Sequence, residues 1–310
     1  MQQQNNWQQI MIWGFICTIL HISLPTPFII ITLWFAIVPT VILYINSRPQ
    51  TFLLTMTLVT AIVFLIYSNL EIQWLWIIVG LTAPAVAIGE SYRRNQSAII
   101  SIRNGAMALL GYSLITLLVM TLSGYDINKE ISEIIRAEIE TLAIAFQGAL
   151  TDQQVTNLIQ IFSLTIPFYL ILVSVILSAI THSMARKACK YVGITIASMQ
   201  PLRDWRLNKT FVWIYLVVML LELFIDVEQG GFFATAIINL SLILSLTFEL
   251  LGFGFILFYA RLKDQRWVPW VTIVLFFILS PFVFTVLSLL GVFDTAFRIR
   301  ERLQNSYERR

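Results

Sequence analysis

The sequence predicts an all-α fold, a polytopic membrane helix bundle, on the basis of three observations. Hydrophobic residues make up 58% of the 310 residues, charged residues make up 12%, and the mean hydropathy is +0.81. This composition has too little polar surface to cover a soluble globule of the same size. The apolar residues also form runs of about 20, the length that a helix needs to cross a bilayer. Because these runs are apolar on all sides, they are not the amphipathic helices of a soluble protein.

The hydrophobic segments number about 8 to 9, counted as runs long enough to span a bilayer. In chain order, the candidates are residues 10–24, 27–45, 51–69, 72–89, 98–122, 158–182, 211–228, 231–260 and 268–292. The first follows MQQQNNWQQ, which has no Lys or Arg, and no small-residue cleavage site comes after it. We therefore expect a retained helix rather than a signal peptide, and a single integral membrane domain over residues 1–310.

Basic residues predict the threading of the chain, because Lys and Arg are retained on the cytoplasmic side of a membrane. Residues 90–104 carry Arg93, Arg94 and Arg103 and are expected inside. Residues 183–210 are also expected inside, since they carry Arg186, Lys187, Lys190, Arg203, Arg206 and Lys209. Counting from these two loops puts the N-terminus in the cytoplasm and residues 124–157 outside.

The same rule fails at the end of the chain. If residues 231–260 and 268–292 each crossed once, the arginine-rich tail would be pushed outside. One of the two segments is therefore expected not to cross simply. Pro281 could split the second, or the first could turn back near Gly252 and Gly254, provided that protein or a watery cavity covers the nonhelical backbone.

Residues 124–157 have the pattern of a water-facing module, and we expect an extracytoplasmic helical hairpin there. Apolar residues recur at helical spacing between charges, at Ile131, Ile135, Ile139, Leu142 and Phe146. Gly148 follows as a stop signal, and Thr151 with Gln154 has the spacing of a capping box that starts the next helix. The hairpin could be a tied-down connection with a solvated acidic face, or a lid over a ligand.

Catalytic and metal-binding motifs are absent from the sequence, so we expect no enzyme, no cofactor and no metal. HExxH, GxSxG and the glycine pattern of a P-loop do not occur. The two histidines, His21 and His182, are too far apart in sequence to suggest a ligand pair, and Cys17 and Cys189 lack CxxC spacing. Topology and anionic lipid explain the basic loop around Trp205, so we expect no nucleic-acid partner.

One predicted span, residues 72–89, is crowded with small side chains. Ala83 and Ala87 lie four residues apart, and Gly80 and Gly89 flank them. Small residues at this spacing let another helix backbone approach closely. Two interpretations stay open: packing inside the bundle, and a docking face for a partner subunit.

The first candidate for ligand binding is a carboxylate at membrane depth. Glu249 lies in the middle of residues 231–260, and Ser241 and Ser245 fall on its helical face. An ionised acid at the bilayer centre costs roughly 2.5 to 3.5 kcal/mol, so this side chain must be protonated, paired or lining a cavity. It could bind the polar or cationic part of a solute or carry a proton. A protonated Glu that bonds to a neighbouring helix is the structural alternative.

Two further carboxylates, Glu222 and Asp226, are four residues apart near the end of another predicted span, with Tyr215 on the same face. They are close enough to the end of that span to reach outer water. We include all three residues in the predicted ligand-binding set.

Four stretches of the sequence resemble the YybS-like family of bacterial membrane proteins. ISLPTPF with IVPTVILY, then GLTAPAVAIGESYRRNQS, MQPLRDWRLNKTF and LLGVFDTAFRIRERL, occur in the order and spacing of that family over about residues 20–303. The last stretch is the most specific, and it contains the matching residues Gly291, Asp294 and Arg298. Trp205 belongs to the third stretch, in which Asn208 stands where the family pattern has Pro.

The resemblance implies a fold similar to the substrate-binding subunits, or S-components, of energy-coupling-factor vitamin transporters. Those subunits carry an alanine docking motif on their first helix. Residues 10–24 contain no Ala, so either the small stripe in residues 80–89 replaces that motif or coupling is absent.

Two functions follow as expectations. The first is S-component-like binding or transport of a small solute in a bacterial cell membrane, with a transporter coupling subunit as a candidate partner. The second is a noncatalytic adaptor or scaffold whose basic loops and tail dock a cytoplasmic or envelope partner. A deep pocket lined by Glu249 and aromatic residues would favour the first, and a close-packed interior would favour the second.

Overall fold

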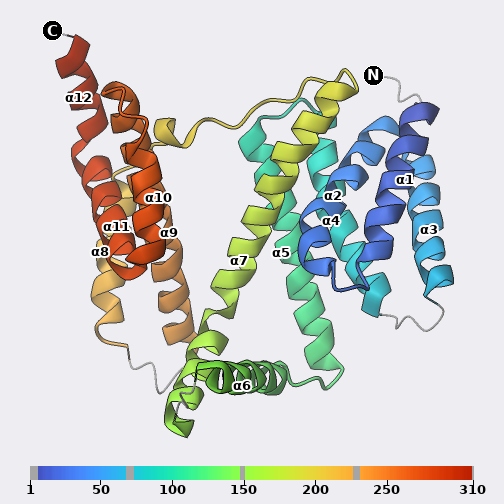
Figure 1. Cartoon of the computed structure of the whole chain (residues 1–310), viewed down its shortest axis with the longest axis horizontal. Helices are drawn as coiled ribbons and strands as arrows, with labels where there is room; N and C mark the ends of the chain where they lie inside the picture. Colours follow the sequence, from blue (N-terminus) through green and yellow to red (C-terminus); the bar gives the residue numbers. More distant parts are fainter. Residues whose placement is uncertain (1–5, 68–72, 147–150, 226–230, 309–310) are drawn as a thin grey trace. The chain divides into compact units, whose positions relative to one another are not determined.

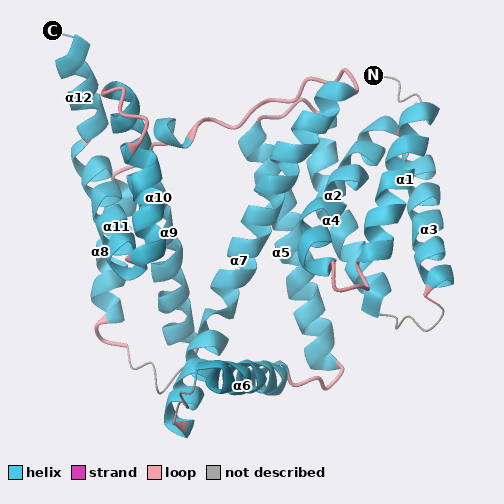
Figure 2. Cartoon of the chain, viewed as in Figure 1, coloured by secondary structure: helices cyan, strands magenta, loops and turns pink. Residues whose placement is uncertain are grey.

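The computed structural model describes residues 6–67, 73–146, 151–225 and 231–308. Within these ranges the chain is helical and contains no strand (Figure 2), which confirms the predicted all-α fold. In chain order, the helices are α1 (Trp7–Ser23), α2 (Ile29–Asn46), α3 (Pro49–Ile66), α4 (Gln73–Arg93), α5 (Ala98–Leu122), α6 (Ile127–Phe146), α7 (Asp152–Tyr191), η1 (Leu202–Asp204), α8 (Thr210–Glu222), α9 (Phe232–Leu262), α10 (Val268–Ile278), α11 (Ser280–Phe297) and α12 (Ile299–Glu308).

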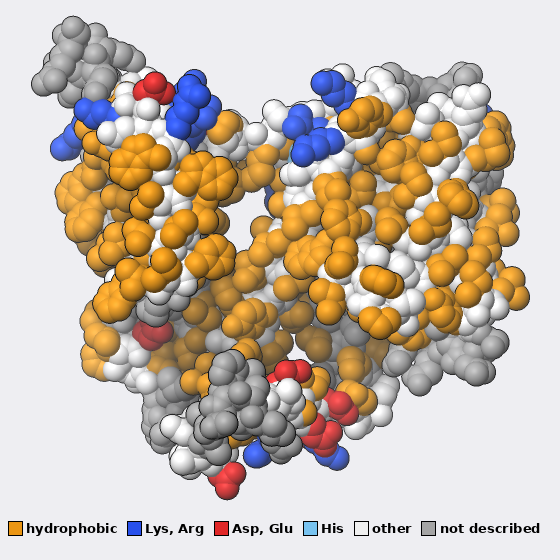
Figure 3. All heavy atoms as spheres, in the orientation of Figure 1, with side chains coloured by type: hydrophobic (Ala, Val, Ile, Leu, Met, Phe, Trp, Pro, Cys, Tyr) orange, Lys and Arg blue, Asp and Glu red, His pale blue; other side chains and the backbone are white. Residues whose placement is uncertain are grey.

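The helices have the lengths and surfaces of a polytopic membrane protein. Six of those described are long and apolar enough to cross a membrane, namely α2, α3, α4, α5, α7 and α9. The bent pair formed by α11 and α12 adds a seventh if it counts as one span. Hydrophobic side chains cover the outward surfaces of the helices in the view of Figure 3, and large ones such as Leu65 are 80% exposed. Such a surface suits lipid rather than water.

The chain divides into two compact units. Unit 1 comprises Met1–Ile127 and Tyr169–Met199, and unit 2 comprises Asn128–Phe168 and Gln200–Arg310. Unit 1 therefore contains α1 to α5 and the second part of α7 (Figure 1). Unit 2 contains nearly all of α6, the first part of α7, and every helix from η1 onward.

The core of unit 1 forms where α2 packs against α1 and α4. Eight consecutive residues of α2, from Ala36 to Leu43, are buried. Two glycines of α4 lie against aromatic rings of neighbouring helices, Gly80 against Tyr112 of α5 and Gly89 against Tyr44 of α2. Small residues of α4 are thus part of the internal packing of this unit.

Helix α7 is longer than its predicted span. It has 40 residues and would measure about 60 Å, twice the hydrocarbon thickness of a bilayer. Its start confirms the predicted capping box: the Thr151 backbone N–H donates to Gln154 Oε1 at 2.9 Å, and the Gln154 N–H donates to Thr151 Oγ1 at 3.4 Å. Its end corrects the predicted loop at 183–210, because residues up to Tyr191 are helical.

The predicted loop at 90–104 is also shorter than expected, since α4 ends at Arg93 and α5 begins at Ala98.

Other predicted elements change in length or lie partly outside the described residues. The predicted span 211–228 becomes the 13-residue helix α8, which ends at Glu222. Helix α6 covers most of the predicted outer hairpin, and its exposed residues include Ile134 and Glu138. The stop signal at Gly148 lies outside the described residues.

The last hydrophobic segment breaks where Pro281 indicated. Helix α10 ends at Ile278, and α11 begins at Ser280 with a proline in its first turn, where a missing backbone N–H costs no helical hydrogen bond. Helix α9 continues without interruption from Phe232 to Leu262, so the alternative turn near Gly252 and Gly254 does not occur.

Helix α11 runs beside α9 in the same direction. Its Ser288 meets Tyr215, whose ring lies against Phe248 of α9 with centroids 5.1 Å apart. Beyond its end, Arg300 reaches the carbonyl of Leu251, further along α9. Helix α10 has 11 residues, or about 16 Å, which is half the thickness of the hydrocarbon core. Helices α10 and α11 therefore form a hairpin, which brings the tail back to the end where α10 began.

This hairpin predicts the side on which the C-terminal tail is exposed. Single cysteines at Arg266, in the loop before α10, and at Arg302, in α12, should react with a membrane-impermeant thiol reagent from the same side. The native Cys17 and Cys189, both buried, are first replaced by Ser. Cysteine at Lys129 should react from the opposite side, as the positive-inside rule requires. Labelling of positions 266 and 302 from opposite sides would show that residues 268–297 cross the membrane.

Candidate binding pocket in unit 2

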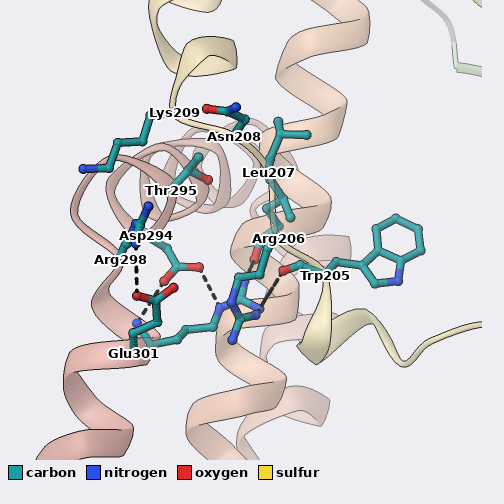
Figure 4. Close-up of a pocket in the computed structure, with 11 residues that line it drawn as sticks. Trp205, Arg206, Leu207, Asn208, Lys209, Asp294, Thr295, Arg298 and Glu301 are labelled. Atoms are coloured by element: carbon teal, nitrogen blue, oxygen red, sulfur yellow. Dashed lines mark hydrogen bonds and ion pairs between the residues drawn. The ribbon is translucent and has the colours of Figure 1, made fainter.

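A pocket of about 490 Å³ lies in unit 2 where the loop before α8 meets the junction of α11 and α12. The residues that line it come from four segments, the loop, α9, α11 and α12 (Figure 4). They are Trp205, Arg206, Leu207, Asn208, Lys209, Leu251, Asp294, Thr295, Arg298, Arg300 and Glu301.

Arg300 holds these segments together. Its side chain is only 1% exposed, and its guanidinium donates hydrogen bonds to three backbone carbonyls. Nη1 donates to the carbonyls of Arg203 at 2.7 Å and of Trp205 at 3.3 Å, and Nη2 donates to the carbonyl of Leu251 at 2.7 Å. One buried cation thus joins the loop before α8 to α9, and satisfies carbonyl groups that would otherwise lack a partner.

Asp294 neutralises this cation and starts α12. Its Oδ2 lies 2.6 Å from Nε of Arg300, and its Oδ1 accepts the backbone N–H of Arg300 at 3.1 Å. A carboxylate at this place is favourable because the N–H groups in the first turn of a helix are unpaired and carry partial positive charge. Between the two residues, Arg298 adopts a left-handed backbone with φ of 51°, where the chain bends by 66° from α11 into α12.

The rim of the pocket carries exposed positive charge. Arg206, Lys209 and Arg298 are exposed, and Glu301 pairs with Arg298 at 3.7 Å. Nη1 of Arg206 donates to the carbonyls of Arg203 and Trp205. Within the described ranges, no carboxylate forms an ion pair with Arg206 or Lys209. Because Asp294 already offsets Arg300, the lining keeps a net positive charge.

The position of the pocket along α9 can be compared with the thickness of a membrane. Leu251 lies about 28 Å from Phe232 along the helix axis, which is close to the thickness of the hydrocarbon core. If Phe232 sits near one edge of the core, the carbonyl that Arg300 binds sits near the other edge. The pocket is then at the level of lipid headgroups.

Three of the four residues expected from the family motifs line this pocket. Asp294 and Arg298 contribute their side chains, whereas the half-buried indole of Trp205 points away from the other lining residues (Figure 4) and its Nε1–H donates to the carbonyl of Gln200 at 3.0 Å. The carbonyl of Trp205 accepts from Arg300. The fourth residue, Gly291, lies outside the pocket, against the backbone of Phe248 in α9.

Two of the carboxylates predicted to bind a ligand, Glu249 and Glu222, accept hydrogen bonds from serines of α9. Glu249 is half-buried and accepts a hydrogen bond from Ser245 Oγ at 3.0 Å. Ser241, expected on the face of Glu249, donates to Glu222 Oε2 at 2.8 Å and so links α9 to α8. None of these four lines the pocket.

The last two members of that set are Tyr215 and Asp226. Tyr215 is buried in the core of unit 2, and its hydroxyl lies 3.3 Å from Ser288 Oγ. Asp226 lies outside the described residues.

The small stripe of α4 belongs to unit 1. Gly80 and Gly89 are buried there against Tyr112 and Tyr44, and Ala83 and Ala87 are half-buried. The two glycines therefore face neighbouring helices of their own unit. The use of the stripe as a docking face for a partner stays a prediction.

Sequence reasoning missed Arg300, Arg206 and Lys209 as members of a site. Arg300 stands inside the quoted stretch LLGVFDTAFRIRERL, six residues after Asp294, but nothing local shows that it turns inward. Topology and anionic lipid were a sufficient explanation for Arg206 and Lys209 in the sequence. One signal for this site was present in the sequence. The stretches MQPLRDWRLNKTF and LLGVFDTAFRIRERL each contain several Arg or Lys residues and an Asp.

Taken together, the helices and their apolar surfaces define a multi-pass membrane protein of the α-helical class. The chain belongs to the family described as predicted membrane protein (DUF2232), whose sequence model matches residues 14–295.

One relative is the uncharacterized protein YybS of Bacillus subtilis (strain 168), which is 25% identical over 138 residues. The match covers 44% of this chain and 44% of that protein, so it spans less than half of the relative's length. No solved structure matches the chain. The resemblance to the YybS-like family is confirmed, whereas the implied similarity to S-components stays a prediction.

Proposed function

We propose that this protein is a noncatalytic membrane protein that binds a small anionic solute in the pocket of unit 2. The observation that supports this function best is the charge of the lining: a buried, neutralised Arg300–Asp294 pair forms the base, and the exposed cations Arg206 and Lys209 stand at the rim without a carboxylate partner among the described residues. A solute anion would supply the missing negative charge.

The base of the pocket is suited to hold the cations in place. Arg300 fixes the carbonyls of Arg203 and Trp205, on either side of Asp204, and so sets the path of the loop that carries Arg206 and Lys209. Binding therefore costs little ordering of the backbone, which is the main way in which a preorganised site gains affinity. By the positive-inside rule, the pocket opens toward the cytoplasm.

The proposal is tested by the thermal stability of the full-length protein in detergent, measured in phosphate and in chloride at equal ionic strength. A ligand that binds the folded state raises its stability, by about 2.7 kcal/mol at a hundred times the dissociation constant. Phosphate should stabilise the parent protein in a saturable way. The double variant Arg206→Gln/Lys209→Gln removes both rim cations and should bind phosphate at least about tenfold more weakly. A factor of ten corresponds to about 1.4 kcal/mol of binding free energy.

Glu249→Gln is the matched control, because Glu249 lies in unit 2 but does not line the pocket. It should retain the phosphate response of the parent. If Glu249→Gln removes the response and the double variant keeps it, the solute binds at Glu249, and the pocket is not the site.

The adaptor function is favoured by a different observation. The interior of unit 2 beside Glu249 is closely packed, because the backbones of α9 and α11 touch at Gly252 and Gly291. The close approach of these backbones leaves little room between the two helices at that level. If phosphate, sulfate and citrate all fail to stabilise the protein, the adaptor becomes the better account, with the exposed basic loop as its docking surface.

A further inference from the structure

We infer that the anion held by this pocket is the phosphate group of an anionic membrane amphiphile, whose hydrocarbon chain lies along α11. This inference rests on the proposed function, since it names the class of solute for the same pocket. A lipid headgroup and a free phosphate compound share the chemistry that Arg206 and Lys209 recognise. The apolar surroundings of the pocket favour the amphiphile.

The first argument is depth. The Leu251 carbonyl, which forms part of the base, lies about one hydrocarbon thickness from the start of α9. Phosphate groups of lipids lie just outside the hydrocarbon core, where basic pockets between transmembrane helices bind anionic headgroups. The half-buried indole of Trp205 beside the pocket agrees with this level, because Trp is enriched at the interface between membrane and water.

The second argument is the surface of α11 next to the pocket. Four large apolar side chains at helical spacing form an exposed stripe along this helix, Val286 61%, Leu289 51%, Phe293 50% and Phe297 52% exposed. Phe293 and Phe297 stack on each other with ring centroids 6.0 Å apart. The stripe ends at the turn of α11 that supplies Asp294 and Arg298 to the pocket.

An amphiphile fits both features at once. Its chain would cover the stripe, and its phosphate would meet the cations at the rim. A water-soluble phosphate compound would use the cations and leave the stripe to bulk lipid. The two ligands therefore differ in whether Phe293 and Phe297 contribute to binding.

Native mass spectrometry of the full-length protein, loaded with phosphatidylglycerol or with phosphatidylcholine of the same acyl chains, tests the inference. The parent should retain phosphatidylglycerol at least about tenfold more strongly, a factor that corresponds to about 1.4 kcal/mol. The double variant Arg206→Gln/Lys209→Gln should lose this preference. Phe293→Ala/Phe297→Ala should weaken retention of phosphatidylglycerol severalfold while leaving the stabilisation by inorganic phosphate unchanged.

Phe277→Ala/Phe282→Ala serves as the control, because these residues are 80% and 75% exposed beside the turn between α10 and α11, at the other end of α11 from the pocket. It should retain the lipid as the parent does. If inorganic phosphate stabilises the protein but the two lipids are retained equally, the inference is wrong and the proposed function stands. If neither phosphate nor phosphatidylglycerol binds, both are wrong.

Discussion

Replacing Arg300 by Met is expected to lower the free energy of unfolding by about 3 to 5 kcal/mol, the cost of removing one partner from a buried ion pair. The change leaves the Asp294 carboxylate buried without its cation and removes the donors for the carbonyls of Arg203, Trp205 and Leu251. Denaturant titration of the purified protein in mixed micelles measures the loss. Phosphate binding should also disappear, because the loop that carries the rim cations loses its anchor.

Arg266→Met is the matched control, because both side chains of the Arg266–Asp264 ion pair are exposed. Exposed ion pairs contribute little to the free energy of unfolding. Its stability should stay close to that of the parent. Combining Arg300→Met with Asp294→Asn should recover part of the loss, because no unpaired charge then remains buried. If Arg300→Met is as stable as the parent, the buried pair does not hold the four segments together.

Placing a methyl group at Gly252 or Gly291 is expected to disrupt the packing of α9 against α11. A Cβ at Gly252 would overlap the carbonyl of Leu287, and one at Gly291 would overlap the carbonyl of Phe248. Backbone cannot move aside as the tip of a flexible side chain can, so Gly252→Ala and Gly291→Ala should each cost at least about 1 to 3 kcal/mol. The same denaturant titration measures this effect.

Gly111→Ala provides the comparison. Gly111 also lies inside a helix, and a Cβ there meets no atom within 4 Å. The substitution should leave stability unchanged or raise it by about 0.5 to 1 kcal/mol, because Ala is the better helix former. Equal effects at Gly111 and Gly252 would mean that α9 and α11 do not approach as closely as described.

The fold class and several element boundaries could be predicted from sequence because they depend on local patterns. Runs of apolar residues located the helices, the Thr151–Gln154 spacing located the start of α7, and Pro281 located the break before α11. These signals act over a few residues. The division into two units within α7 falls beside Pro167, but the helix continues across it, so this proline does not by itself show where the units part.

The pocket could be predicted only in part. The stretches with Trp205, Asp294 and Arg298 were singled out, but Arg300 meets the carbonyl of Arg203 across 97 positions and that of Leu251 across 49. The periodicity of apolar residues does not predict contacts between residues so far apart in the sequence. At Ser241, helical spacing placed the hydroxyl on the face of Glu249, but it did not show that Glu222 of α8 accepts its hydrogen bond. A face defined along one helix does not show which helix covers it.

The most direct test of anion binding in the pocket is the alkylation rate of a cysteine placed at Glu301, an exposed lining residue, in protein without Cys17 and Cys189. Inorganic phosphate should slow alkylation at position 301 at least threefold and saturably, relative to chloride at equal ionic strength, an effect that corresponds to about 0.65 kcal/mol. A cysteine at Arg266, outside the pocket, should react at the same rate in both salts. Equal rates at position 301 with and without phosphate would contradict an anion site in this pocket.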